Sequence, residues 1–243
     1  NLPFGLAIIL NALLVWHGSL KAEVENYKAD ICVYGGTASG VMAALAAEKE
    51  GSTVILIEPT RCLGGMTGGG INHLDWGKGE TVGGSTYKIL MEGLKDQKRA
   101  HGGHAKYGIG NKQYRERFKK LVKDRGITVI YDHRVGKVQV GDVTINKPTR
   151  EQPIALGEKI VSKNKNNFIQ SIILDYAPVD ETGCPIPVPK KRNVITVSAK
   201  VFIDCSYEGD LLAMSGVRYT WGRESRDHYG ESLAGVRPSL WVH

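Results

Sequence analysis

The stretch from Asp30 to Gly70 constrains the fold most strongly, because two apolar runs alternate there with two glycine-rich loops. Residues 31–34 form a short apolar run typical of a buried parallel strand, and Thr53–Ile57 form a second run rich in β-branched side chains. The alanine-rich segment Val41–Lys49 between them predicts a helix. This order of strand, glycine-rich turn, helix and strand indicates a βαβ unit that binds a dinucleotide.

The first glycine-rich turn departs in one position from the G-x-G-x-x-G fingerprint. Gly35 allows the tight turn and Gly40 allows close packing of helix on strand, but Thr37 replaces the glycine that lets a pyrophosphate approach the backbone. We expect the Thr37 hydroxyl to donate to a phosphate oxygen. The N–H groups of the helix beginning near Ser39 are expected to bind the same anion. The residues of this turn predicted to bind the cofactor are Gly35, Gly36, Thr37, Ala38, Ser39 and Gly40.

Glu58 closes the second strand, about 20 residues after the turn, where an acid accepts hydrogen bonds from ribose hydroxyls. A carboxylate at this position disfavours a 2′-phosphate, which argues against NADP. Taken alone, Glu58 fits an exposed acid at a strand end equally well. The surrounding βαβ pattern favours the nucleotide interpretation.

A second glycine-rich loop, RCLGGMTGGG, follows Glu58 almost directly. A nicotinamide enzyme does not usually need such a loop, whereas FAD is long enough to require exposed backbone amides along its pyrophosphate and ring. A flexible surface loop and a NAD-binding dehydrogenase are the alternatives. The segment adds the following predicted FAD contacts: Pro59, Arg61, Leu63, Gly64, Gly65, Met66 and Thr67.

Two blocks of the sequence resemble the FAD-dependent oxidoreductase family of bacterial, often exported, flavoproteins. The first runs from Val33 to Glu80, with a GGTASG turn, an IEP strand end and an LGGMTGGG loop followed by HLDWG; the second is AKVFIDCSYEGDLLAMSGVRYTWGRES, followed by YGESLAGV. The resemblance implies a glutathione-reductase-like FAD fold in which Asp204, Gly209 and Asp210 also face the cofactor. Members of this family are longer, so we expect this chain to be an N-terminal fragment.

The predicted fold class is α/β, with a Rossmann-like FAD-binding domain that starts as βαβ with a parallel sheet and spans residues 23–243. An antiparallel, meander-like segment at 133–198 is expected to interrupt it, with Asp142–Asn167 as a polar surface insertion. The remaining elements predicted from periodicity are helices at Thr86–Lys98, Lys112–Asp124 and Leu211–Ser215, and strands at Ile127–Tyr131, Val135–Val140, Phe168–Tyr176, Val194–Val197 and Val201–Ile203.

The redox chemistry of such a protein would come from the flavin, with a side chain acting as acid or base. His73 and Asp75 are the candidate catalytic residues because they follow the second glycine-rich loop, and histidine titrates near neutrality. Arg223 and Glu224 are further candidates. We predict an FAD-dependent oxidoreductase acting on a small organic or carbohydrate-derived molecule, with a truncated or non-catalytic flavin-binding electron carrier as the alternative.

No Cys-x-x-Cys pair and no Cys/His cluster has zinc-site spacing, so no metal site is predicted. The net charge of +7 comes from scattered Lys and Arg residues, which predicts solvated surfaces and no nucleic-acid partner. The apolar run Phe4–Trp16 is too short for a stable membrane span and resembles the core of a secretory signal, with Ala22 as a cleavage position. We therefore expect residues 1–22 to direct export to the periplasm or beyond, with a cytoplasmic protein as the alternative.

Overall fold

A computed structural model describes residues 24–70, 83–85, 110–147, 168–217, 219 and 224–235. The signal-like segment, the helix predicted at Thr86–Lys98 and residues 148–167 of the polar insertion lie outside the described residues. So do His73, Asp75 and Arg223.

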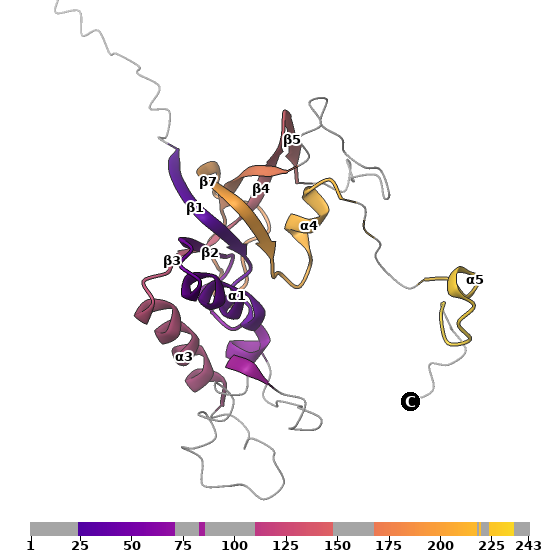
Figure 1. Ribbon diagram of the computed structural model, residues 1–243, viewed down its shortest axis with the longest axis horizontal. Helices are drawn as coiled ribbons and strands as arrows, with labels where there is room; N and C mark the ends of the chain where they lie inside the picture. The colour runs from indigo at the N-terminus through magenta and orange to yellow at the C-terminus, as the bar shows by residue number, and fades with distance from the viewer. Residues whose placement is uncertain are drawn as a thin grey trace, which may run out of the picture.

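The predicted βαβ unit is present and is extended by a third parallel strand (Figure 1). Strand β1 (Glu25–Tyr34) pairs with β2 (Val54–Glu58), and β2 pairs with β3 (Thr128–Tyr131), all in parallel. Helix α1 (Ala38–Lys49) connects the first two strands, and α3 (Gly110–Asp124) precedes the third. The carboxyl ends of these strands therefore lie along one edge of the sheet.

The antiparallel segment joins this sheet through one long strand. Strand β7 (Lys191–Asp204) runs parallel to β1 and antiparallel to β6 (Ile169–Tyr176). Strands β4 (His133–Val140) and β5 (Val143–Asn146) continue the antiparallel part, which produces a seven-stranded sheet of order β3-β2-β1-β7-β6-β4-β5. This mixed sheet confirms the predicted fold class.

Several details of the sequence prediction were wrong. Val194–Val197 and Val201–Ile203 belong to one strand, because Ser198 and Ala199 between them stay paired with β1. For the same reason β1 begins at Glu25, well before the apolar residues. The polar insertion contains β5, and the second glycine-rich loop contains a short turn of π-helix, η1 (Met66–Gly70).

Two hydrophobic cores lie on opposite faces of the sheet, because successive strand residues point to opposite sides. Val33 and Leu56 pack with α1 and α3 on one face, where Phe118 of α3 is buried. Cys32 and Ile57 point to the other face, where they belong to a cluster that includes Val135 and Val138 of β4 and Leu211 of helix α4 (Asp210–Met214). Helices α1 and α3 therefore cover one face of the parallel strands, while residues of the antiparallel strands and of α4 pack on the other.

Helix α5 (Arg226–Tyr229) is a short element that the sequence did not predict, and Figure 1 shows it apart from the sheet. Within the described part of the chain, no helix has the length and apolar character needed to cross a membrane.

Candidate functional site

The carboxyl edge of the sheet brings the two sequence blocks into direct backbone contact. Gly35 N donates to the Ile57 carbonyl at 2.8 Å, and Cys205 N donates to the Tyr34 carbonyl at 2.7 Å. Gly35 has a φ of 93°, and a Cβ at this position would lie 2.6 Å from Ser206 N. Only glycine therefore allows the first turn to pack against the segment that follows β7.

Thr37 caps helix α1, and its hydroxyl is fully used inside the protein. Its Oγ1 donates to the Cys205 carbonyl at 2.8 Å and accepts from Gly40 N at 3.2 Å. Ser39 Oγ lies 2.9 Å from the same oxygen, and since the single Thr37 proton goes to Cys205, the Ser39 hydroxyl is the donor in that contact. The predicted hydrogen bond from Thr37 to a phosphate is thus replaced by a structural one.

The anion-binding capacity of this turn lies in the backbone at the start of α1. The helix begins at Ala38, before the predicted segment Val41–Lys49 and next to Ser39, near which its beginning was expected. The N–H groups of Ala38 and Ser39 are in the first turn, where no carbonyl four residues earlier in the helix can accept from them. Together with the positive end of the helix dipole, they suit a phosphate.

Glu58 is buried beside this helix end, with a relative exposure of 6%. Its Oε2 accepts from Gly36 N at 2.7 Å, and its Oε1 accepts from Thr60 N at 2.7 Å and from the Thr60 hydroxyl. Burial is the main cause that raises the pKa of this carboxyl, and the hydrogen bonds from Thr60 and Gly36 oppose the rise. Two carboxylate oxygens offer about four acceptor positions, so Oε2 keeps one for a further donor.

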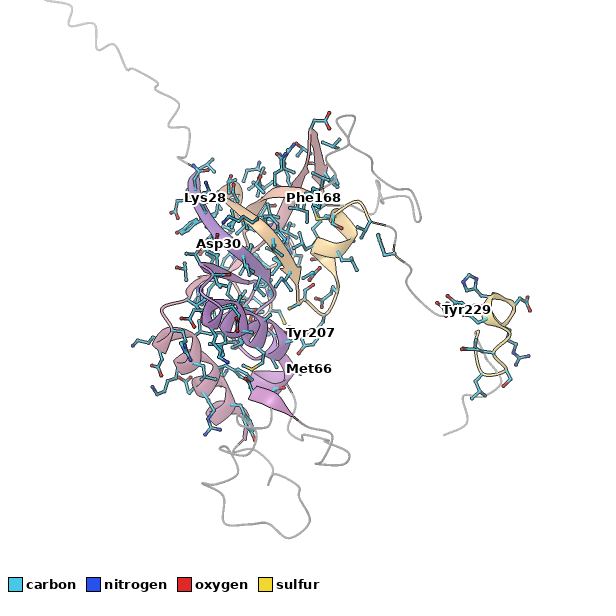
Figure 2. All side chains as sticks on the ribbon, viewed as in Figure 1. Lys28, Asp30, Met66, Phe168, Tyr207 and Tyr229 are labelled. Carbon is cyan, nitrogen blue, oxygen red and sulfur yellow. The ribbon has the colours of Figure 1, made fainter. Side chains whose placement is uncertain are left out.

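The second glycine-rich loop docks onto the first. Gly64 N donates to the Gly36 carbonyl at 2.8 Å, which places the two turns side by side. Met66 N donates to Tyr207 Oη at 2.8 Å, and Figure 2 shows Met66 and Tyr207 next to each other. The loop is therefore held both by the nucleotide turn and by the segment after β7.

These elements surround a cleft of about 720 Å³. One side is formed by the glycine-rich turns, and the other by strand β4, the end of β5 and the connection between β6 and β7. Seven of the predicted cofactor-binding residues line it: Gly35, Thr37, Glu58, Pro59, Gly65, Met66 and Asp210.

Three other predicted residues do not line the cleft but contact the elements that form it. Arg61 Nε lies 3.0 and 2.9 Å from the two carboxylate oxygens of Asp132, so its guanidinium points to the β3–β4 corner. Leu63 is fully buried in the core beneath α3. The carboxylate of Asp204 accepts from Ser206 N at 2.9 Å and from Leu212 N at 2.7 Å, and thus fixes the start of α4.

Seven further predicted residues do not line the cleft: Gly36, Ala38, Ser39, Gly40, Gly64, Thr67 and Gly209.

Asp210 lines the cleft and forms an ion pair of 2.6 Å with Lys147 Nζ. This ion pair joins α4 to the end of β5.

Sequence reasoning missed most of the far wall of the cleft. Arg134, Lys147 and Thr182 come from the antiparallel segment, where no motif marked them. Tyr207 and Glu208 lie inside the YEGDL match, which was the available signal for them. Cys62 and Arg115 also line the cleft, and the Arg115 guanidinium lies 3.5 Å from the Cys62 thiol.

The residues fit FAD in three respects. Glu58 combines a free acceptor position with access to the cleft, as a ribose partner requires. A Cβ on Gly36 would lie 2.8 Å from Glu58 Oε2, so the close approach of turn and acid depends on glycine. The second loop lengthens the site beyond what the first turn alone offers. Over the part of the chain that the structure describes, no group of His, Cys, Asp and Glu side chains could hold a metal ion.

A family model described as FAD dependent oxidoreductase matches residues 30–242 of this chain. FAD is therefore the cofactor, as predicted. No curated protein matches the sequence.

Among solved structures, the chain is similar to a geranylgeranyl bacteriochlorophyll reductase-like protein from Thermoplasma acidophilum, at 15% identity and a TM-score of 0.45, over 79% of this chain and 43% of that one. It is also similar to the myxobacterial chondrochloren halogenase CndH, at 14% identity and a TM-score of 0.43, over 74% of this chain and 37% of that one. THI4 of Thermovibrio ammonificans is similar at 13% identity and a TM-score of 0.39, over 78% of this chain and 87% of that one. This chain thus spans less than half of the length of the first two.

Proposed function

The chain belongs to the FAD-dependent oxidoreductase family, and on that premise we propose that it binds FAD in the cleft at the carboxyl edge of its sheet and oxidises or reduces a small organic or carbohydrate-derived molecule. The observation that carries this proposal is the meeting of three features at one cleft. These are the buried carboxylate of Glu58, the start of helix α1 and the second glycine-rich loop.

Each feature has a distinct role in the proposed complex. The Glu58 carboxylate accepts a ribose hydroxyl, and its negative charge disfavours a 2′-phosphate at the same place. The start of α1 reaches the cleft through Thr37, and the N–H groups of Ala38 and Ser39 that follow it bind the diphosphate at the edge of the cleft. Gly65 and Met66 lie along the path that the long cofactor takes beyond the diphosphate. FAD supplies the redox chemistry when it is bound.

His73 and Asp75 are the candidates for proton transfer to or from the substrate, because both follow the second glycine-rich loop in the sequence. Export by way of residues 1–22 belongs to the same proposal, with Ala22 at the cleavage position. An electron carrier that binds FAD without turning over a substrate is the competing function.

The test is the flavin spectrum of the purified protein. We expect yellow protein with flavin absorbance that dithionite bleaches, and reoxidation by an added acceptor. Bleaching by one member of a panel of sugars, polyols and small organic acids would establish the enzyme. The same flavin with no substrate in such a panel would favour the electron carrier, and colourless protein after incubation with FAD would refute both.

The role of His73 is tested separately by His73→Ala. The expected result is full FAD occupancy with slowed reduction by the substrate. Unchanged reduction at full occupancy would remove His73 from the chemistry.

A further inference from the structure

The connection between β6 and β7 contains a compact turn, Asp180–Pro187, that is built on one carboxylate. Asp180 Oδ1 accepts from Thr182 N at 2.8 Å, from the Thr182 hydroxyl at 2.6 Å and from Cys184 N at 3.1 Å. A bridge between Val179 and Pro185 closes the turn. These contacts hold the turn in one shape, although most of its residues are exposed.

This turn faces the nucleotide site. Thr182, Gly183 and Pro185 line the same cleft as Glu58. Arg134 of β4 also lines the cleft, and its guanidinium donates to the Pro187 carbonyl. The turn is therefore tethered to the sheet by a charge-assisted hydrogen bond at the wall of the cleft.

The wall lies on the adenosine side of the site. Glu58 is paired with Tyr131, the last residue of β3, and β4 begins two residues later. Val135 N donates to Tyr34 Oη at 3.2 Å, so the start of β4 passes close to the carboxyl end of β1. The start of α1 is attached to the other side of Glu58, through Gly36. A nucleotide whose diphosphate binds α1 and whose ribose binds Glu58 thus directs its base toward Arg134.

We propose that the Asp180–Pro187 turn, held by Arg134, is the wall against which the adenine ring of the cofactor binds. The assignment rests on the proposed FAD site. The guanidinium plane of Arg134 and the ring of Pro185 offer flat surfaces for a purine. The Thr182–Gly183 backbone adds polar groups at the same wall.

The proposal is tested on protein stripped of flavin, by titration with FAD and by competition with ADP, following the quenching of flavin fluorescence. The variants are Arg134→Ala and Asp180→Ala, with Glu181→Ala as the matched control, because Glu181 is an exposed residue of the same turn that does not line the cleft. Arg134→Ala leaves the internal hydrogen bonds of the turn intact, so it carries the test if Asp180→Ala does not fold.

We expect Arg134→Ala and Asp180→Ala to weaken FAD and ADP binding by the same factor, on the order of tenfold, because each variant removes charge-assisted hydrogen bonds that hold the wall in place. Glu181→Ala should bind both ligands like the wild type. Unchanged FAD binding in both variants, or weaker FAD binding with unchanged ADP binding, would overturn the proposal and leave the FAD site itself standing. A wild-type protein that binds no FAD would refute the proposed function instead.

Discussion

Gly36 N donates a hydrogen bond of 2.7 Å to Glu58 Oε2, and this contact joins the first glycine-rich turn to the end of β2. It fixes the carboxylate next to the start of α1, where a ribose and a diphosphate need adjacent partners. The second glycine-rich loop donates to the carbonyl of the same Gly36 through Gly64 N. Gly36 is thus the point at which the three parts of the proposed FAD site meet.

Gly36→Ala is expected to displace the carboxylate. The added Cβ would lie 2.8 Å from Glu58 Oε2 and 2.7 Å from Leu63 Cδ2, and both are confined by burial. We expect a loss of about 1–3 kcal/mol in the free energy of unfolding, as for other overpacked cores, together with weaker FAD binding. Urea unfolding measures the first effect. A variant as stable as the wild type would show that the turn can relax away from Glu58.

Tyr207→Phe removes the acceptor for Met66 N while keeping the aromatic ring. This hydrogen bond of 2.8 Å ties the second glycine-rich loop to the segment after β7. We expect hydrogen exchange at the Met66 amide to become faster, with a fall of about 1 kcal/mol in the free energy of local opening. An unchanged exchange rate would mean that the other contacts of the loop, among them the one between Gly64 and Gly36, are enough to hold the Met66 amide.

Arg61→Ala is expected to lower the melting temperature. Arg61 Nη2 lies 2.8 Å from Asp132 Oδ2, in addition to the contacts of Nε, and Asp132 is a buried residue with a φ of 60°. Removing the guanidinium leaves a buried carboxylate without this partner. Arg61→Lys should recover only part of the loss, because an ammonium group cannot make the paired contact. Equal melting temperatures for Arg61→Lys and the wild type would contradict this.

Asp30 is expected to make the stability depend on acid pH. Hydrogen bonds from Lys200 and then from Thr53 hold the pKa of its carboxyl well below the ordinary value of 3.8. Protons therefore bind the unfolded chain more readily, so the stabilisation is complete above pH 3.8 and is lost as the pH falls further toward the folded-state pKa. Asp30→Asn should melt at a lower temperature than the wild type at pH 7. The difference should shrink below pH 3.8, and a constant difference would exclude this origin.

The parallel part of the fold could be predicted from local patterns because its strands are buried apolar runs. Val33 and Leu56 lie in short runs with a helix between them, and glycines mark the turns. The polar start of β1 at Glu25 could not be predicted, because its strand geometry comes from pairing with β7, far away in the sequence. Pairing with β1 also joins Val194–Val197 and Val201–Ile203, which were predicted as two strands, into the single strand β7.

The site residues that belong to a local sequence motif could be predicted. Those that only the tertiary fold brings together could not. Glu58 follows from its distance to the turn. The use of the Thr37 hydroxyl by Cys205 depends on residues 168 positions apart, and the position of Arg134 in the cleft wall depends on the path of β4. No local pattern encodes either relationship.

The most direct test of the account is an equilibrium titration of flavin-free protein with FAD, comparing the wild type, Glu58→Ala and Glu50→Ala. Glu50 is an exposed acid at the opposite end of α1 and serves as the matched control. We predict that the wild type and Glu50→Ala bind FAD with equal affinity, and that Glu58→Ala binds it at least about tenfold more weakly. Equal FAD affinity in all three proteins would contradict the central claim that the Glu58 carboxylate holds the cofactor.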